Sequence, residues 1–276
     1  MTIDDSGFNY VRQLVRDRAA IVLEEGKQYL VDSRLSLLAR REGYESAQEV
    51  IDRLRAAPSG PLQRKVIEAM TTTETLFFRD GKPYEALKNT ILPDLLKLRG
   101  VERKIQIWSC ACSSGQEPYS VGMLMREHFP TLGTWDVRVV ATDISTQMLD
   151  RSRAGRYSQL EVNRGLPHVF LQRYFERLPD RNAGYDWQIK LDLRRMVDFR
   201  ELNLASAWSM PPTDLVMLRN VLIYFDIETK RQILTKVRKV IRPGGYLMLG
   251  TAETTMNLVD GFELVRSDGT SYYRCA

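Results

Sequence analysis

Residues 104–120 read KIQIWSCACSSGQEPYS, and this stretch decides the fold that we expect for the chain. Lys104–Ser109 is a strand candidate, small residues follow it as a turn, and a helix is expected from about residue 117 to 128. Strands that alternate with helices form mostly parallel sheets, whose ligands bind at the carboxyl ends of the strands. We therefore expect an α/β protein with a ligand site at this turn.

The same alternation continues towards the C-terminus. One helix is expected to begin near Ser145. Another is expected to be capped by Asp226 and to be ended by Pro243-Gly244-Gly245. Residues 156–195 interrupt the rhythm, and NAGYDWQIKLDL within them resembles a short hairpin, so we expect a small inserted β-subdomain there. The remaining expected strands are Val137–Asp143, Met196–Phe199, Asp214–Leu218 and Tyr246–Gly250, with a terminal hairpin over Phe262–Cys275 that turns at Asp268-Gly269.

No strand pattern precedes residue 100. Apolar residues at helical spacing begin at Phe8, Asp32-Ser33 can cap a second helix, and Ser46 can cap a third. A fourth helix is expected from about Leu62 to Met70. We therefore expect a helical domain over residues 1–66 and an α/β domain over residues 67–276.

Composition sets wide bounds. The chain has 276 residues, of which 43% are hydrophobic and 27% charged, enough for a core without disulfide support. The formal charge of +5 is compatible with a solvated surface, an acidic partner or a nucleic acid. Three cysteines and two histidines give neither a disulfide framework nor zinc-ligand spacing. No apolar run reaches the roughly 20 residues that span a bilayer, and MTIDDSGFNY lacks a secretory signal, so we expect a cytoplasmic protein without membrane insertion.

Two features of the α/β part predict the type of ligand. The turn after the first strand is rich in small residues, which lets a ligand approach the backbone, but it is not the GxGxxG of dinucleotide sites. Asp143 ends the next strand roughly 28 residues after Gly115, where an acid accepts hydrogen bonds from ribose hydroxyls or only caps a helix. Together they favour a ligand with a ribose and without a pyrophosphate, and S-adenosylmethionine meets both conditions.

Three further segments carry polar side chains beside apolar ones. In TTTETLFFRD (71–80), Arg79 follows two phenylalanines and either fixes a carboxylate or is a surface charge. In LRNVLIYFD (218–226), Arg219-Asn220 ends a strand and points at the ligand crevice. Asn203, also just after a strand, either contacts an adenine edge or makes a turn.

These segments, in this order, resemble the CheR family of chemotaxis protein methyltransferases. The resemblance covers nearly the whole chain and includes FFRD, ATDIS, RNVLIYF and PGGYLMLG. It implies a small N-terminal helical domain before a Rossmann-like class I S-adenosylmethionine-dependent methyltransferase domain. The implied reaction is methyl transfer to glutamate side chains of chemotaxis receptors, with S-adenosylhomocysteine as product and no metal.

The resemblance also implies roles for individual residues. Glu117 would take the amino group of the methionine moiety, and Asp143 would take the ribose hydroxyls. Arg79 would hold the substrate carboxylate and Tyr224 would lie near the methyl group, so these two are the catalytic candidates. The implied cofactor contacts are Thr73, Thr75, Arg79, Glu117, Asp143, Asn203, Leu204, Arg219 and Asn220.

The implied partner is the cytoplasmic domain of methyl-accepting receptors. The helical domain would face its acidic methylation helices through Arg34 and Arg40. Members that bind a C-terminal receptor pentapeptide resemble one another in a GxGP turn, whereas this chain has LPDRNAG at residues 178–184. We therefore expect methylation that does not depend on a pentapeptide.

Two other classes remain open at this point. A nucleic-acid methyltransferase would share the fold, but such enzymes carry an N/D-P-P-Y/F motif where this chain has Arg219-Asn220; Met210-Pro211-Pro212 lies before the strand instead. A non-catalytic adaptor would be expected to lose Arg79 or the cofactor acids, which this chain keeps.

Overall fold

The computed structural model describes residues 3–179, 184, 186–267 and 269–276, and it divides the chain into two compact units. The helical unit comprises Met1–Thr72, Asn203–Ala207 and Tyr224–Lys230, and the sheet unit comprises the rest. Two expected turns lie partly outside the described residues: the stretch 178–184 at positions 180–183, and the terminal turn at Asp268.

The helical unit is built from amphipathic helices around a shared core. Val11, Val31, Leu35, Ile51 and Leu54 are completely buried in it. Burial of one apolar stripe from each helix stabilises an arrangement that isolated helices of this length could not maintain in water. Its helices are α1 (Asp5–Ala19), α2 (Gln28–Glu42), α3 (Ala47–Ala56) and α4 (Pro61–Met70).

The helix starts confirm one expected cap and correct another. Ser46 caps α3, its side chain accepting the N–H of Glu49. The expected cap at Asp32 is wrong, because α2 begins at Gln28 and Asp32 instead accepts the N–H of Ile3 at 3.0 Å. The expected domain boundary after residue 66 falls inside α4, where Val66 and Met70 are both buried. Among the described residues, no helix has the length and apolarity needed to cross a membrane.

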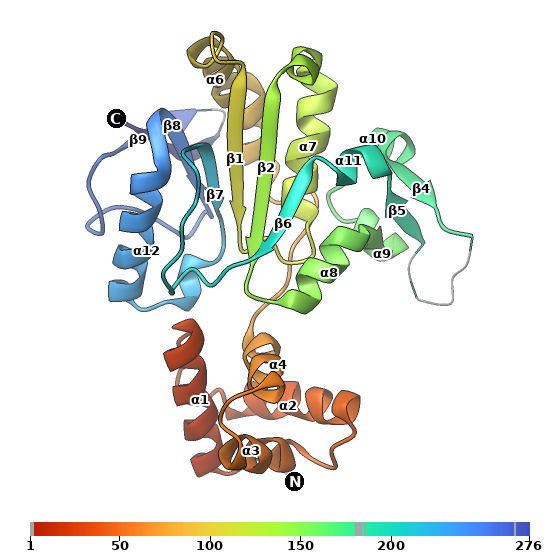
Figure 1. Ribbon diagram of the computed structural model, residues 1–276, viewed down its shortest axis with the longest axis vertical. Helices are drawn as coiled ribbons and strands as arrows, with labels where there is room; N and C mark the ends of the chain where they lie inside the picture. Colours follow the sequence, from red (N-terminus) through yellow and green to blue (C-terminus); the bar gives the residue numbers. More distant parts are fainter. Residues whose placement is uncertain (1–2, 180–183, 185, 268) are drawn as a thin grey trace. The chain divides into compact units, whose positions relative to one another are not determined.

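The sheet unit contains a seven-stranded sheet in the order β6-β2-β1-β7-β8-β10-β9 (Figure 1). The pairs from β6 through β8 are parallel, and β10 pairs antiparallel with both β8 and β9. This is the expected α/β sheet with its terminal hairpin. The strands are β1 (Lys104–Cys110), β2 (Asp136–Asp143), β6 (Val197–Glu201), β7 (Thr213–Leu218), β8 (Ile241–Leu249), β9 (Phe262–Ser267) and β10 (Thr270–Cys275).

Helices connect the strands, and two of the sequence expectations need correction here. One helical stretch over residues 82–98, not expected from the sequence, precedes β1. Pro243-Gly244-Gly245 does not end a helix but lies within β8, because the preceding helix ends at Val240. The helices are α5 (Lys82–Ala86), the π-helix η1 (Leu87–Ile91), α6 (Leu92–Leu98), α7 (Gln116–His128), α8 (Thr146–Ala154) and α12 (Ile227–Val240), with short 3-10 helices η2 (Pro130–Thr134) and η3 (Leu222–Tyr224).

The insertion forms the expected small β-subdomain. Its antiparallel sheet has the order β3-β5-β4, and rings from β3 and β4, Tyr157 and Phe175, pack edge-on against Phe77 at centroid distances of 5.0 and 5.7 Å. The expected hairpin over NAGYDWQIKLDL is wrong, since its described part provides one strand and a short helix. The elements are β3 (Arg156–Tyr157), α9 (Gln159–Val162), α10 (His168–Tyr174), β4 (Phe175–Arg177), β5 (Trp187–Ile189) and α11 (Leu191–Arg194).

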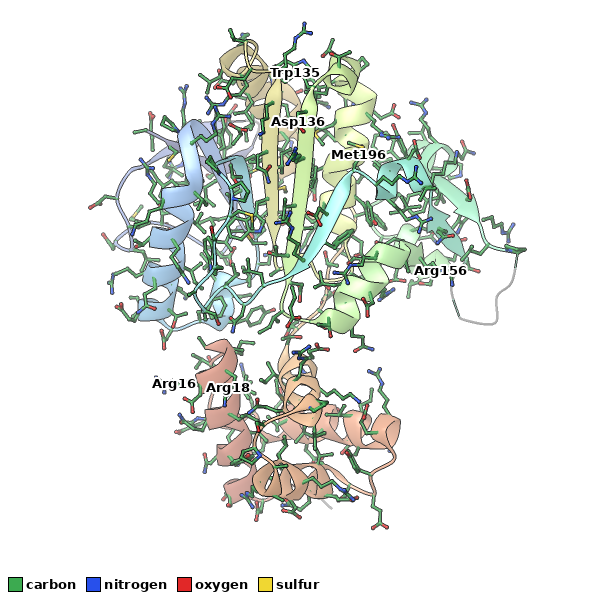
Figure 2. All side chains as sticks on the ribbon, in the orientation of Figure 1. Arg16, Arg18, Trp135, Asp136, Arg156 and Met196 are labelled. Carbon is green, nitrogen blue, oxygen red and sulfur yellow. The ribbon has the colours of Figure 1, made fainter. Side chains whose placement is uncertain are left out.

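A buried ion pair closes the amino edge of the large sheet. Figure 2 marks this edge by Trp135 and Asp136, where β2 begins. At the start of β7, Asp214 accepts hydrogen bonds from Arg99 Nε at 2.7 Å and from the N–H of Gln106 at 2.9 Å. Arg99 also donates to the carbonyl of Pro243 at 2.9 Å. Asp214 and Arg99 thus tie β7 to β1 and to Pro243 in β8 at this edge. The residues expected to face the ligand lie at the opposite edge.

Candidate active site

The loop between β1 and α7 has an unusual backbone. Ala111 and Ser113 both have φ of 50°, and Gly115 has φ of 91°. Residues other than glycine seldom adopt this left-handed region, and such strain concentrates at ligand sites. The N–H of Cys112 bonds the carbonyl of Thr142 at 2.9 Å, which ties the loop to the end of β2.

Side chains behind the loop fix its carbonyl groups. The hydroxyls of Ser152 and Tyr157 donate to the carbonyls of Ser113 and Ser114 at 2.8 and 2.7 Å. A Cβ at Gly115 would lie 3.0 Å from the Ser152 hydroxyl, so the packing as well as the positive φ requires glycine. The loop is thus held from behind, as a ligand cradle requires.

Asp143 joins the loop after β1 to the loop after β2. Its Oδ2 accepts the N–H of Ser113 at 2.7 Å, and its Oδ1 accepts the N–H of Ser145 at 2.8 Å. The N-cap of α8 is Ser145, whose side chain accepts the N–H of Met148, so Asp143 is not the cap of that helix. Asp143 is buried at the carboxyl end of β2, where the sequence placed it.

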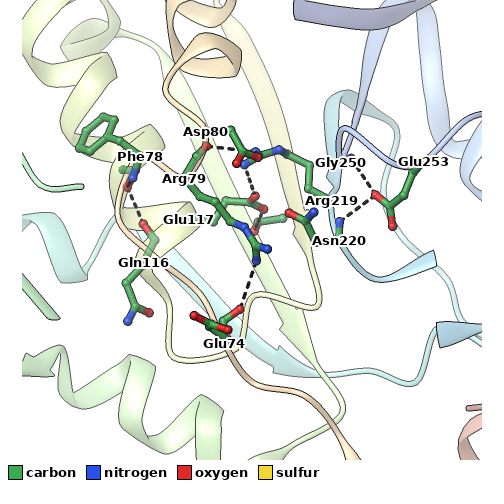
Figure 3. Close-up of polar contacts among 12 residues, drawn as sticks. Glu74, Phe78, Arg79, Asp80, Gln116, Glu117, Arg219, Asn220, Gly250 and Glu253 are labelled. Carbon is green, nitrogen blue, oxygen red and sulfur yellow. Dashed lines mark hydrogen bonds and ion pairs between the residues drawn. The ribbon is translucent and has the colours of Figure 1, made fainter. Parts of the chain in front are cut away.

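The centre of the site is a buried pair between Glu117 and Arg219 (Figure 3). Arg219 Nη1 lies 3.1 Å from Glu117 Oε2, and the Ser109 hydroxyl donates to Glu117 Oε1 at 2.8 Å. Arg219 Nη2 donates to Asp80 Oδ2 at 2.6 Å and to the carbonyl of Arg79 at 3.1 Å. Only 1% of the Arg219 side chain is exposed, so this cation requires both carboxylates.

Burial and pairing act in opposite directions on these groups. Burial raises the pKa of Glu117, while the Arg219 charge and the Ser109 hydrogen bond partly offset that rise. Burial alone would lower the pKa of Arg219, but Glu117, Tyr84 and Asp80 together outweigh it and the net direction is upward. Within the described part of the chain, Arg219 Nε is buried without a hydrogen-bond partner. A buried donor in this position is typical of a site that takes a polar ligand.

Arg79 comes from a tight loop beside this pair. Phe78 and Asp80 have φ of 48° and 70°, and the N–H of Phe78 bonds the Ser120 hydroxyl at 3.0 Å. Arg79 is partly buried, and its Nη1 donates to the carbonyl of Glu74 at 3.3 Å (Figure 3). Thr73 and Thr75 are partly buried in the same segment, and the Thr73 carbonyl accepts from the Ser113 hydroxyl at 2.6 Å. Arg79 is thus adjacent to Arg219, and its positive charge contributes to lowering the pKa of Glu117 against the effect of burial.

The end of β7 carries Asn220, which has φ of 58°. Its N–H bonds Glu253 Oε2 at 2.7 Å. Sequence reasoning did not predict the contacts of Asp80, Ser109 and Glu253, although all three lie in or beside motifs that were singled out. The structure therefore brings six predicted residues to the carboxyl edge of the sheet: Thr73, Arg79, Glu117, Asp143, Arg219 and Asn220.

Other predicted residues belong to the helical unit. Asn203 donates to the carbonyl of Arg18 at 2.7 Å, and the N–H of Val22 bonds the carbonyl of Tyr224 at 2.9 Å. Leu204 is buried. Figure 2 labels Arg18 in the last turn of α1.

The two predicted receptor-facing arginines differ in their surroundings. Arg34 donates to the carbonyl of Met70 at 2.6 Å and to the Thr72 hydroxyl at 3.1 Å. Burial lowers the pKa of Arg34. Arg40 is exposed in the last turn of α2. Arg34 thus holds the end of α4, whereas Arg40 faces solvent.

The cysteines of the first motif are buried beneath the loop. Cys110 and Cys112 carry free thiols, and burial raises the pKa of both. They pack as small apolar residues.

Comparison with known proteins assigns this chain to a family. The model of the CheR methyltransferase all-alpha domain matches residues 6–71, and that of the CheR methyltransferase SAM binding domain matches residues 73–270. The chain belongs to the CheR methyltransferase family. It is 43% identical to chemotaxis protein methyltransferase 1 of Pseudomonas aeruginosa, over 99% of both chains. It is 40% identical to chemotaxis protein methyltransferase Cher2 of Pseudomonas putida, again over 99% of both.

A solved structure, the N-methyltransferase NodS from Bradyrhizobium japonicum, matches 72% of this CheR chain and 99% of its own, with 13% identity and a TM-score of 0.38. Membership in the CheR family confirms the expected activity, an S-adenosylmethionine-dependent methyltransferase that forms glutamate methyl esters in bacterial chemotaxis. It also confirms the helical domain before a class I methyltransferase domain.

The residues of this CheR protein fit the cofactor. A buried acid beside a strained small-residue loop suits a ligand with an ammonium group, and a second acid at the end of β2 suits a ribose. Among the described residues, no group of three or more His, Cys, Asp and Glu side chains could hold a metal ion.

Proposed function

We propose that the carboxyl edge of the sheet holds the methionine and ribose parts of S-adenosylmethionine, and that Arg79 holds the carboxylate of a receptor glutamate. The buried Glu117–Arg219 pair carries this proposal, because an acid this buried needs a cationic partner. The ammonium group of the ligand is a second cation that Glu117 can accept.

Each predicted residue has a role in this proposal. Glu117 binds the ammonium group, and Asp143 accepts hydrogen bonds from the ribose hydroxyls. Thr73, Thr75 and Asn220 line the same edge, and the positive charge of Arg219 favours the ionised form of Glu117. Asn203 and Leu204 contact the adenine, and Tyr224 lies near the transferred methyl group.

The bound cofactor supplies a methyl group that its sulfonium already activates. A glutamate carboxylate is ionised at neutral pH, so the residues of this chain need supply no base. Their task is to orient and desolvate the carboxylate, and orientation contributes roughly 7–11 kcal/mol at best. Arg79 suits this task because its planar guanidinium binds a carboxylate with two parallel hydrogen bonds.

The decisive experiment replaces Arg79. We expect Arg79→Ala to abolish methyl transfer to purified receptor fragments while S-adenosylhomocysteine binding, followed by calorimetry in EDTA, persists. Arg138→Ala is the matched control, because Arg138 is exposed and pairs with Asp136 at the opposite edge of the same sheet. Wild-type turnover in Arg79→Ala at saturating cofactor would contradict the assignment, and loss of binding would move Arg79 to the cofactor.

The receptor-facing surface is proposed to include Arg34 and Arg40. Reversal to glutamate should weaken methylation by charge repulsion, and more so at low salt, because salt screens exposed charges. Arg34→Glu should keep part of its defect at high salt, since it also breaks the bonds to Met70 and Thr72. Normal methylation by the double variant would place the receptor surface elsewhere.

We also propose that methylation does not depend on a receptor pentapeptide. The support is the absence of a GxGP turn from the sequence at residues 178–184. Titration with the free peptide Gly-Trp-Glu-Glu-Phe should give no micromolar binding, and such binding would overturn the proposal.

Because the proposed methyl acceptor is a receptor glutamate, we also propose where the enzyme acts and how its two domains divide the work. The enzyme acts in the cytoplasm, where receptor methylation helices lie, and residues 1–66 serve receptor docking while residues 67–276 carry out the chemistry. Labelled-methyl assays on receptor membranes and on RNA should show transfer only to the former.

A further inference from the structure

The two central strands β7 and β8 end side by side, with Leu218 paired to Leu249. Arg219 and Asn220 follow the first strand, and Gly250 follows the second. Glu253 lies three residues beyond Gly250, in a turn that carries no cofactor candidate. Its carboxylate nevertheless points back to both strand ends (Figure 3).

Four backbone N–H groups converge on this carboxylate. Oε2 accepts the N–H of Asn220 and of Gly250, both at 2.7 Å. Oε1 accepts the N–H of Val221 at 2.8 Å and of Leu222 at 2.7 Å. Hydrogen bonds to a charged acceptor are about twice as strong as neutral ones. The carboxylate therefore fixes three consecutive residues of the loop after β7, and with them the direction in which Asn220 points.

Two backbone features depend on the same contact. Asn220 holds a φ of 58°, in the left-handed region that asparagine adopts more often than most residues. A Cβ on Gly250 would lie 2.6 Å from Asn220 Nδ2 and 2.7 Å from Glu253 Oε2. The glycine therefore leaves the space that Asn220 and Glu253 occupy together.

We infer that Glu253 is a positioning residue for the methyl transfer, which acts on the cofactor by fixing the backbone and side-chain direction of Asn220. This inference rests on the proposed role of Asn220 at the cofactor site. Glutamate suits the role because both of its oxygens accept hydrogen bonds. A glutamine would aim an NH₂ group at two of the four donors.

The test measures S-adenosylhomocysteine affinity by calorimetry in a double-mutant cycle. Glu253→Gln should weaken binding by about tenfold in the wild-type background and by less than about threefold in an Asn220→Gly background, because coupled residues are not additive. Glycine is chosen at position 220 because it tolerates the positive φ.

Tyr246→Phe is the control for a merely structural loss. Tyr246 lies in the same strand β8, and its hydroxyl bonds Asp94 far from the site. This variant should lower the melting temperature without changing affinity.

Receptor methylation by Glu253→Gln should recover most of the wild-type rate at saturating cofactor, because the defect lies in cofactor binding.

The outcomes separate the inference from the function on which it rests. A lower melting temperature with unchanged affinity in Glu253→Gln would reduce Glu253 to a structural role and overturn the inference. An equal effect in both backgrounds would also overturn it. Unchanged affinity in Asn220→Gly would remove the proposed role of Asn220 and the inference together, while wild-type binding and methylation would stand.

Discussion

Strand β7 carries a buried arginine–carboxylate pair at each end, and the two pairs differ in how they are completed. At the amino end, Asp214 is held by Arg99 and by the N–H of Gln106, at a register shift between β7 and β8. At the carboxyl end, Arg219 bridges two carboxylates, leaves a buried donor without a partner in the described structure, and lies beside strained loops. The first pair ties β7 to β1 and β8, whereas the second is the pair that we propose to face the cofactor.

Burial of an ion pair therefore does not by itself mark a ligand site. Positive φ outside glycine is more frequent near the carboxyl edge, at Ala111, Ser113, Asp80 and Asn220, than at the amino edge. Arg103, which precedes β1, has φ of 49°. Replacing one residue at a time should make the two ends fail in different ways.

The largest effect is expected for Arg219→Met. Loss of the cation leaves Glu117 buried beside Ser109 alone, so the ammonium site loses its alignment. Turnover on receptor fragments should fall roughly 100- to 1000-fold, the size of loss found when one preorganised hydrogen-bond donor is removed from an active site. A loss of stability without a loss of turnover per folded molecule would contradict the comparison.

Arg99→Met should show the opposite pattern. Removing one partner of a buried pair costs about 3 kcal/mol of unfolding free energy, less whatever Arg242 restores from its position 3.3 Å from Asp214. Turnover per folded molecule should remain within about twofold, because the pair lies at the far end of the strand. Urea unfolding measures the stability, and initial rates measure the turnover. A large loss of turnover would show that the pair at the amino end also matters for catalysis.

A smaller effect should follow Gly165→Ala in the insertion. Its Cβ would lie 2.0 Å from the carbonyl oxygen of Phe77 at a φ of +83°, so the loop that carries Arg79 must shift. We expect about 1–3 kcal/mol of destabilisation and a several-fold lower rate. Gly26→Ala is the control, since Gly26 has φ of +84° with nothing within 4 Å. Equal losses in both variants would show that φ alone matters.

The smallest effect is a pH dependence from Glu117. Burial raises its pKa above the ordinary 4.5, so the folded protein binds this proton more tightly than the unfolded chain. The resulting stability is present below pH 4.5 and is lost as pH rises through the raised value. As the pH is raised from acidic to neutral, the melting temperature of the wild type should therefore decrease relative to that of Glu117→Gln. Cofactor affinity should move the other way, because only ionised Glu117 attracts an ammonium group; a flat affinity profile would contradict its role.

Much of the fold and part of the candidate site could be predicted from the sequence, because the signals that define strands and helix caps are local. Apolar runs located the strands, Ser46 gave a true cap, and Asp143 was placed at a strand end. The cap at Asp32 failed because helix burial outweighed a local capping signal. Pro243-Gly244-Gly245 was accommodated by a register shift between β7 and β8.

The contacts of Asp80 and Glu253 could not be predicted in the same way. Asp80 meets Arg219 across 139 residues, and Glu253 meets Asn220 across 33. Such pairs arise only when the sheet brings distant strand ends together. Arg34 illustrates the same limit, because its bonds to Met70 and Thr72 depend on how the helices pack.

The buried thiols beneath the β1–α7 loop have a practical consequence. Only the thiolate reacts readily with alkylating reagents, and burial raises the pKa of Cys110 and Cys112. Labelling at these two positions therefore requires the loop to open first. The rate of alkylation, followed by mass spectrometry, would report how often the loop opens and how far a bound ligand slows it, with no cysteine introduced by mutation.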